Sequence, residues 1–160
     1  MSGFVIHALP VAGGILALAP LPGGAGSYDA DLAHLHDWRP ALVISMTTLA
    51  EMTASGAADL GADLQENGTR WAHVPVEDYG VPNPEVTDIW EAAAQAALLA
   101  LQGGGRVLIH CRGGCGRSGM AALRLMIEAG EDPDAALKRL RAVHPCAVET
   151  DEQMLWARQE

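Results

Sequence analysis

The chain has 160 residues, of which 49% are hydrophobic and 19% are charged. These values are typical of a globular protein with an apolar core, so we expect residues 1–160 to form a single domain and exclude disordered and fibrous classes. The formal net charge of −10 and the presence of only one lysine, Lys138, argue against nucleic-acid binding, which needs clustered Lys and Arg.

The first apolar segment, residues 4–24, is almost free of charge. Prolines and a Gly-Gly pair interrupt it, and no basic stretch precedes it, so neither a signal peptide nor a membrane span is indicated. The segment predicts two short strands joined by turns. We therefore expect no membrane insertion.

The rest of the chain alternates between strand and helix patterns. Short apolar runs bounded by Gly, Pro or polar residues predict strands at residues 15–19, 41–46, 71–76 and Arg106–His110. Helices are predicted at residues 31–38, 49–54, 57–66 and 84–102, then at about 117–129, from 132 onward and after 150. This order predicts an α/β fold with a central, mainly parallel sheet of about four to five strands flanked by helices. Arg106–His110 is expected to be the central, buried strand.

A glycine-rich turn follows this strand and opens the next helix. Glycines allow successive backbone N–H groups to point inward and surround a tetrahedral anion, and the helix start adds the positive end of its dipole. Cys111 would lie at the bottom of such a loop, where the thiolate is favoured, and Arg117 could donate two parallel hydrogen bonds to a bound phosphate. The expected phosphate-binding residues are Arg112, Gly113, Gly114, Cys115, Gly116 and Arg117.

The pattern His110-Cys111-x5-Arg117-Ser118 resembles the signature of the protein tyrosine and dual-specificity phosphatase superfamily. The whole chain is most similar to the small kinase-associated, dual-specificity-type members. The resemblance implies a protein tyrosine phosphatase-like fold and a phosphoric monoester hydrolase that works through a phosphocysteine intermediate. It gives Cys111 the role of nucleophile, Arg117 that of phosphate binding, and the Ser118 hydroxyl that of assisting breakdown of the intermediate. His110 would support the loop and the thiolate.

Two further segments resemble parts of the same family. Pro75-x-x-Asp78 is similar to the general-acid loop, whose acid contributes about 10²–10⁴-fold to the rate, so Asp78 is the expected acid and Glu77 the alternative. Residues 147–153 resemble the segment whose glutamine positions the hydrolytic water, which gives this role to Gln153. Thr150-x-x-Gln153 is also a capping box at a helix start, and both interpretations are kept open.

The remaining cysteines and histidines suggest no cofactor and no metal site. Cys115 is either a small filler in the loop or a reversible disulfide partner of Cys111. The three cysteines contain no Cys-x-x-Cys pair, which fits neither a secreted disulfide scaffold nor structural zinc and favours a reducing cytoplasm. Arg112 either raises the positive potential at the mouth of the loop or is simply solvated.

One competing motif occupies the same loop. Gly114-x-Gly116-x-x-Gly119 satisfies the Gly-x-Gly-x-x-Gly pattern of dinucleotide-binding folds. Such a fold needs a further parallel strand ending in an acidic residue about 20 positions on, whereas this region is helical and contains Lys138 and Arg139. Dinucleotide binding is therefore disfavoured.

The expected substrate is a phosphorylated protein or peptide, with phosphotyrosine favoured and phosphoserine and phosphothreonine left open. A phosphoinositide phosphatase and a non-catalytic phosphoprotein-binding module of the same fold are the alternatives. The acidic chain makes an anionic lipid a less favourable substrate. The sequence does not indicate an oligomeric state.

Overall fold

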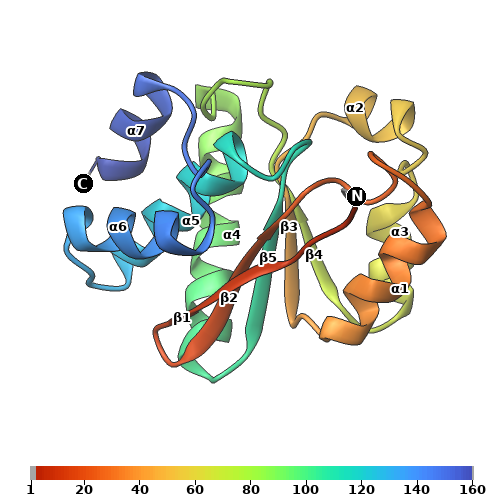
Figure 1. Cartoon of the computed structure of the whole chain (residues 1–160), viewed down its shortest axis with the longest axis horizontal. Helices are drawn as coiled ribbons and strands as arrows, with labels where there is room; N and C mark the ends of the chain where they lie inside the picture. Colours follow the sequence, from red (N-terminus) through yellow and green to blue (C-terminus); the bar gives the residue numbers. More distant parts are fainter. Residues whose placement is uncertain (1–2, 160) are drawn as a thin grey trace.

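The structure is a computed structural model that describes residues 3–159. Its centre is a five-stranded sheet in the order β1-β2-β5-β3-β4 (Figure 1). Among the described residues only β1 is antiparallel to its neighbour; the other neighbouring strands are parallel. The predicted fold class and the central position of β5 are confirmed. The strands are β1 His7–Val11, β2 Gly14–Ala19, β3 Leu42–Ser45, β4 Arg70–His73 and β5 Arg106–His110.

Helices cover both faces of this sheet (Figure 1). Figure 1 shows α1 and α3 on one side and α4, α5, α6 and α7 on the other. In the described part of the chain, none of these helices is both long enough and apolar enough to span a membrane. The helices are α1 Tyr28–Trp38, α2 Leu49–Ala54, α3 Leu60–Glu66, α4 Pro84–Gln102, α5 Gly116–Glu128, α6 Pro133–Val143 and α7 Asp151–Arg158.

Three element boundaries differ from the prediction by three residues, namely the start of α1, the start of α3 at Leu60 instead of residue 57, and the end of β4. Helix α1 begins at Tyr28, three residues earlier than predicted, because the Ser27 side chain accepts a hydrogen bond from the backbone N–H of Ala30 and caps the helix there. Strand β4 ends at His73 rather than at residue 76. Beyond His73 the N–H groups of Val74 and Val76 still donate to the carbonyls of Ser45 at 2.8 Å and Met46 at 3.2 Å, so this segment stays beside β3 although regular strand pairing has ended.

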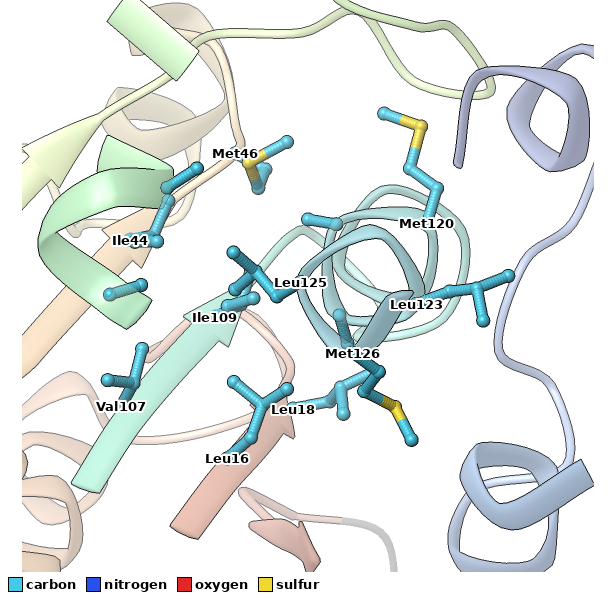
Figure 2. Packing of buried hydrophobic residues seen from close by; sticks show 14 of the residues in the cluster. Leu16, Leu18, Ile44, Met46, Val107, Ile109, Met120, Leu123, Leu125 and Met126 are labelled. Atoms are coloured by element: carbon cyan, nitrogen blue, oxygen red, sulfur yellow. The ribbon is translucent and has the colours of Figure 1, made fainter. Parts of the chain in front are cut away.

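Side chains along the inner strands alternate between the two faces of the sheet, and helices bury both faces. On β5, Val107 and Ile109 point into the larger core beneath α4 and α5, while Leu108 points into the smaller core beneath α1 and α3. Figure 2 shows Ile109 beside Leu125 of α5, with Val107 further back along β5. Burial on both faces gives the continuous apolar run that identifies a central parallel strand.

The parallel arrangement brings the chemically important loops to one edge. The segments that follow β3, β4 and β5 all leave the sheet at its carboxyl end, which is where parallel α/β sheets form their sites. Glu51 lies on α2 after β3, Asp78 lies in the loop after β4, and Cys111 follows β5 directly. Residues far apart in sequence therefore meet at a single place.

Candidate active site

The loop between β5 and α5 is shaped by close contacts of its backbone. The N–H of Leu21 donates to the carbonyl of Arg112 at 3.1 Å and ties the loop to the segment after β2. Gly114 has a φ of 82°, and a Cβ there would lie 2.9 Å from the backbone of Ala19, so this position requires glycine. Gly113 has neither a positive φ nor a close neighbour, so the expected special conformation is absent at that position.

Cys111 lies at the base of this loop. Its side chain is buried, and its Sγ is 3.3 Å from the Oγ of Ser118 on the first turn of α5. Because α5 begins at Gly116, its unpaired N–H groups and positive dipole end face the loop. Cys111 also lines a cavity of about 230 Å³ together with Arg112 and Asp78. The sulfur is thus reachable from a polar cavity at the N-terminus of α5. Such a position favours the binding of an anion.

Arg117 is a fully buried guanidinium, with 1% of its side chain exposed. Its Nη1 donates to Glu51 Oε1 at 2.7 Å and to the carbonyl of Val76 at 2.7 Å, and its Nη2 donates to Glu51 Oε2 at 2.8 Å. Its Nε has no hydrogen-bond partner among the described residues. Since a buried unpaired donor is costly, Arg117 has a donor available for an oxygen of a bound anion.

Glu51 is a site residue that the sequence reasoning did not identify. Hydrogen bonds from Arg117 are the main reason that its pKa is lowered from 4.5 to about 2. A detectable signal was present in the sequence, because Thr48-x-x-Glu51 is a capping box at the start of α2. The capping box anchors the carboxylate, which accepts a hydrogen bond from the Thr48 backbone N–H at 2.9 Å while it binds Arg117.

Asp78 faces the same cavity from the loop after β4. Its Oδ1 lies 3.4 Å from Nη2 of Arg117, and 39% of its side chain is exposed. The next residue, Tyr79, has a φ of 64°, an uncommon conformation for an aromatic residue, and its N–H donates to Asp78 Oδ1 at 3.0 Å. Glu77 lines a different cavity, beside Thr48. The structure therefore brings Asp78, and not Glu77, to Cys111.

His110 is wholly buried behind the loop and does not line the cavity. The indole N–H of Trp71 donates to Ser45 Oγ, so the Ser45 hydroxyl is free to donate its proton to His110 Nε2, 2.5 Å away. Nδ1 then carries the ring proton and donates it to the carbonyl of Cys111 at 3.2 Å. Burial lowers the pKa of His110 to about 4, so the ring is neutral. The chain Trp71–Ser45–His110–Cys111 supports the loop from below.

Gln153 is buried at the first turn of α7. The predicted capping box is confirmed: the Thr150 side chain accepts from the Gln153 N–H, and Gln153 Oε1 accepts from the N–H of Thr150. Its Oε1 also accepts from the Glu149 N–H at 2.9 Å, and its Nε2 donates to the Gly80 carbonyl at 3.2 Å. The side-chain amide thereby links α7 to the loop that carries Asp78, and Gln153 is not among the residues that line the cavity.

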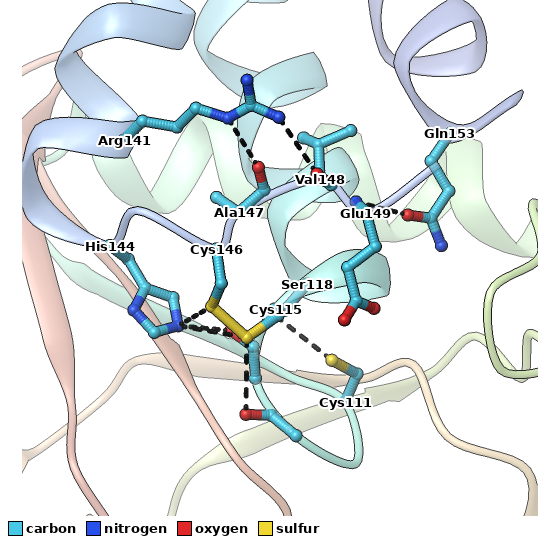
Figure 3. The surroundings of a disulfide bond; sticks show 12 residues. Cys111, Cys115, Ser118, Arg141, His144, Cys146, Ala147, Val148, Glu149 and Gln153 are labelled. Atoms are coloured by element: carbon cyan, nitrogen blue, oxygen red, sulfur yellow. Dashed lines mark hydrogen bonds between the residues drawn. A yellow bond between two sulfur atoms is a disulfide. The ribbon is translucent and has the colours of Figure 1, made fainter. Parts of the chain in front are cut away.

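Cys115 is bonded to Cys146, and this corrects both interpretations of it as a filler or as a partner of Cys111 (Figure 3). The two interpretations considered only the loop itself, whereas Cys146 arrives from the segment between α6 and α7, 31 residues away. Cys111 is the free cysteine of the described chain. His144 lies beside the disulfide, and its Nε2 donates to the Gly114 carbonyl at 2.9 Å. Cys115, His144 and Cys146 form a compact group, but both sulfurs are already bonded to each other.

Comparisons with known proteins agree with the fold described above. Residues 26–159 match the family model described as "Swiss Army Knife protein, DSP-PTPase phosphatase domain". A kinase-associated phosphatase whose catalytic-site cysteine is replaced by serine superposes with a TM-score of 0.85 at 22% identity, covering 99% of this chain and 94% of that one. Tk-PTP in its active form gives a TM-score of 0.73 at 26% identity, covering 94% and 92%.

A further solved structure of similar fold is a complex with PI(5)P. It is PTPMT1 in complex with PI(5)P, with a TM-score of 0.73 at 17% identity, covering 95% of this chain and 92% of that one. A search of curated proteins finds no significant match.

Proposed function

The chain belongs to the DSP-PTPase phosphatase domain family of Swiss Army Knife proteins, and on this premise we propose that it is a cysteine-dependent phosphomonoester hydrolase that acts on phosphoproteins. Phosphotyrosine is the favoured substrate, with phosphoserine and phosphothreonine as further ones. One observation supports the proposal: Cys111 lies at the base of the loop before α5, and Arg117, whose Nε is unpaired, lies on the first turn of α5 with Asp78 Oδ1 3.4 Å from its Nη2.

In the first step, the Cys111 thiolate attacks the phosphorus and the bond to the leaving oxygen breaks. Backbone N–H groups of the loop and the Nε of Arg117 donate to the phosphoryl oxygens as charge develops on them. Asp78 gives its proton to the leaving oxygen, and its place on the cavity wall fits this role. The products are a phosphocysteine and a neutral alcohol or phenol.

In the second step, water attacks the phosphocysteine and inorganic phosphate leaves. Asp78, now a carboxylate, accepts a proton from the water. The Ser118 hydroxyl, 3.3 Å from the sulfur, donates a hydrogen bond to the thiolate as the S–P bond breaks. We retain positioning of the water by Gln153 as a proposal, although its amide oxygen already accepts two backbone hydrogen bonds.

Phosphate release from a generic aryl phosphate tests the activity. We expect turnover by the natural chain and none by Cys111→Ser, while Cys111→Ser still binds inorganic phosphate in a calorimetric titration. Rapid acid quench of the natural enzyme should leave a phosphoryl group on the peptide that contains Cys111. Phosphate binding without turnover by the natural chain would instead identify a non-catalytic phosphoprotein-binding module.

A phosphoinositide phosphatase is the other alternative, because a protein of similar fold is known in complex with PI(5)P. We also propose that residues 1–160 form one catalytic domain that uses neither cofactor nor metal. Location in the cytoplasm belongs to the proposal as well. In a reducing compartment the Cys115–Cys146 disulfide would form only under oxidation.

A further inference from the structure

Glu149 is a second carboxylate on the wall of the proposed catalytic cavity. It lines this cavity together with Cys111 and Asp78, and Figure 3 shows its side chain extending from the loop before α7 toward Cys111. A Cβ added at Gly116 would collide with Glu149 Oε1, so the carboxylate lies against the first residue of α5. Its oxygens form no hydrogen bond or ion pair with residues 3–159. Neither phosphate binding nor either chemical step described above uses this carboxylate.

The backbone around Glu149 is held in an unfavourable conformation. Val148 has a φ of 69°, which is strained for a β-branched residue and persists only where the surroundings impose it. The Arg141 guanidinium donates to the carbonyls of Ala147 at 2.9 Å and Val148 at 3.0 Å, and the Val148 N–H donates to the Cys115 carbonyl at 3.2 Å. These contacts fix the direction in which the chain presents the next side chain, that of Glu149.

Two further contacts hold the same segment from either side. The disulfide joins Cys146 to Cys115, which lies between β5 and α5. Gln153 Oε1 accepts a hydrogen bond from the Glu149 N–H. Backbone strain at binding sites is commonly retained because it positions a functional group. Tyr79, next to Asp78, is the other residue of positive φ that adjoins a carboxylate of this cavity. Both carboxylates are therefore presented by strained backbone.

The charged side chains around the cavity carry more negative than positive charge. The two guanidinium groups, of Arg112 and Arg117, are opposed by the three carboxylates of Glu51, Asp78 and Glu149. Glu51 binds Arg117 through both oxygens, so much of that positive charge is already compensated. A substrate that brings additional negative charge would be repelled by Glu149, whereas a positive group beside the phosphate would be attracted.

We propose that Glu149 determines specificity, by selecting phosphopeptides that carry Lys or Arg next to the phosphorylated residue and by disfavouring substrates with further phosphate groups. This inference rests on the proposed phosphatase activity and narrows its substrate class. The proposed mechanism uses Asp78 for proton transfer. Glu149 takes part in neither step, so its charge can act on substrate recognition alone.

Steady-state kinetics on matched substrates test this role. Three phosphotyrosine peptides that differ only in Lys, Gln or Glu beside the phosphorylated residue, and a water-soluble short-chain PI(5)P, are compared with a small aryl phosphate. We expect kcat/KM to fall by about threefold to tenfold at each step from Lys to Gln to Glu, and PI(5)P to be poorer than all three peptides. Salt screens interactions between surface charges, and the Debye length shortens severalfold between roughly 0.05 and 0.5 M salt. The preference should therefore shrink as salt is raised over this range.

Glu149→Gln keeps the shape of the side chain and removes its charge. It should reduce the Lys-over-Glu preference to about threefold or less while leaving kcat for the aryl phosphate within about twofold. Glu152→Gln changes an exposed carboxylate three residues further on and should leave the preference intact. An unaltered preference in Glu149→Gln, no preference in the natural enzyme, or faster hydrolysis of PI(5)P than of the Lys peptide would overturn the inference. Absence of aryl phosphate hydrolysis by the natural chain would instead refute the proposed function itself.

Discussion

Arg117 and Glu51, 66 residues apart, form a bidentate pair in which Nη1 lies 2.7 Å from Oε1 and Nη2 lies 2.8 Å from Oε2. Burial alone would lower the pKa of Arg117, but the hydrogen bonds to Glu51 raise it above its ordinary value. The pair fixes the plane of the guanidinium and leaves Nε as the unpaired buried donor of this side chain. Helix α2, which carries no residue of the Cys-x5-Arg pattern, thereby orients the Arg117 guanidinium.

Replacing Glu51 should disturb both activity and stability. In Glu51→Gln only one oxygen remains to accept from Arg117, so we expect kcat/KM for an aryl phosphate to fall about 10–100-fold as the guanidinium loses its fixed plane. The free energy of unfolding should decrease by about 1–3 kcal/mol, as measured by urea denaturation. Glu66→Gln, on the exposed surface of α3, is the control and should change neither quantity. A Glu51→Gln enzyme with normal kcat/KM would show that Arg117 needs no partner.

Asp78 and Glu77 can be separated by the dependence of the rate on the leaving group. Asp78→Asn should slow hydrolysis of a phosphotyrosine peptide by about 10²–10⁴-fold, because the phenolate then leaves without a proton. The same variant should slow an aryl phosphate with an acidic phenol much less. Glu77→Gln serves as the neighbouring control and should affect neither substrate, since Glu77 lines another cavity. Equal slowing of both substrates by Asp78→Asn would remove Asp78 as the acid.

The buried His110 predicts a specific dependence of stability on pH. Burial lowers its pKa in the folded chain from 6.5 to about 4, so the unfolded chain binds more protons than the folded chain between these values. Its contribution to the free energy of unfolding is present above pH 6.5 and is lost as the pH falls toward 4. In an NMR titration the His110 ring should remain neutral until about pH 4. A His110 midpoint near 6.5 would contradict the neutral Trp71–Ser45–His110 chain.

Reduction of the Cys115–Cys146 disulfide should destabilise the chain. The bond joins residues 31 apart, and opening a loop of this length is expected to lower the free energy of unfolding by about 3–4 kcal/mol. The measurement is best made in a Cys111→Ser background, where the remaining thiol chemistry is confined to this pair. Cys146→Ser in that background should match the reduced chain and should no longer respond to dithiothreitol. An identical stability with and without reductant would mean that the bond does not form in solution.

Local sequence patterns were sufficient to predict the fold class and the family. The buried run Val107–Ile109 predicted a central strand because only a strand covered on both faces is apolar at every position. The order of strands and helices predicted the parallel sheet, and the Cys111-to-Arg117 spacing indicated the superfamily, which the family model confirms. These features are encoded within a few neighbouring residues, so they could be recognised without coordinates.

Contacts between distant segments could be decided only by the tertiary structure. Glu51 was predicted only as part of a helix, and Cys115 was compared only with its neighbour Cys111, because nothing local indicates which remote residue will meet them. Glu149 was noted only as part of residues 147–153, because nothing local indicates that the residue after the positive-φ Val148 lines the same cavity as Cys111. The amino-acid sequence by itself thus predicted Cys111, Arg117 and Asp78 as the residues of the proposed chemistry, since that prediction depends on short-range spacing. Only packing decided which remote side chains meet them, namely Glu51 at Arg117 and Glu149 at the cavity, because the carboxyl ends of parallel strands bring together segments that are far apart along the chain.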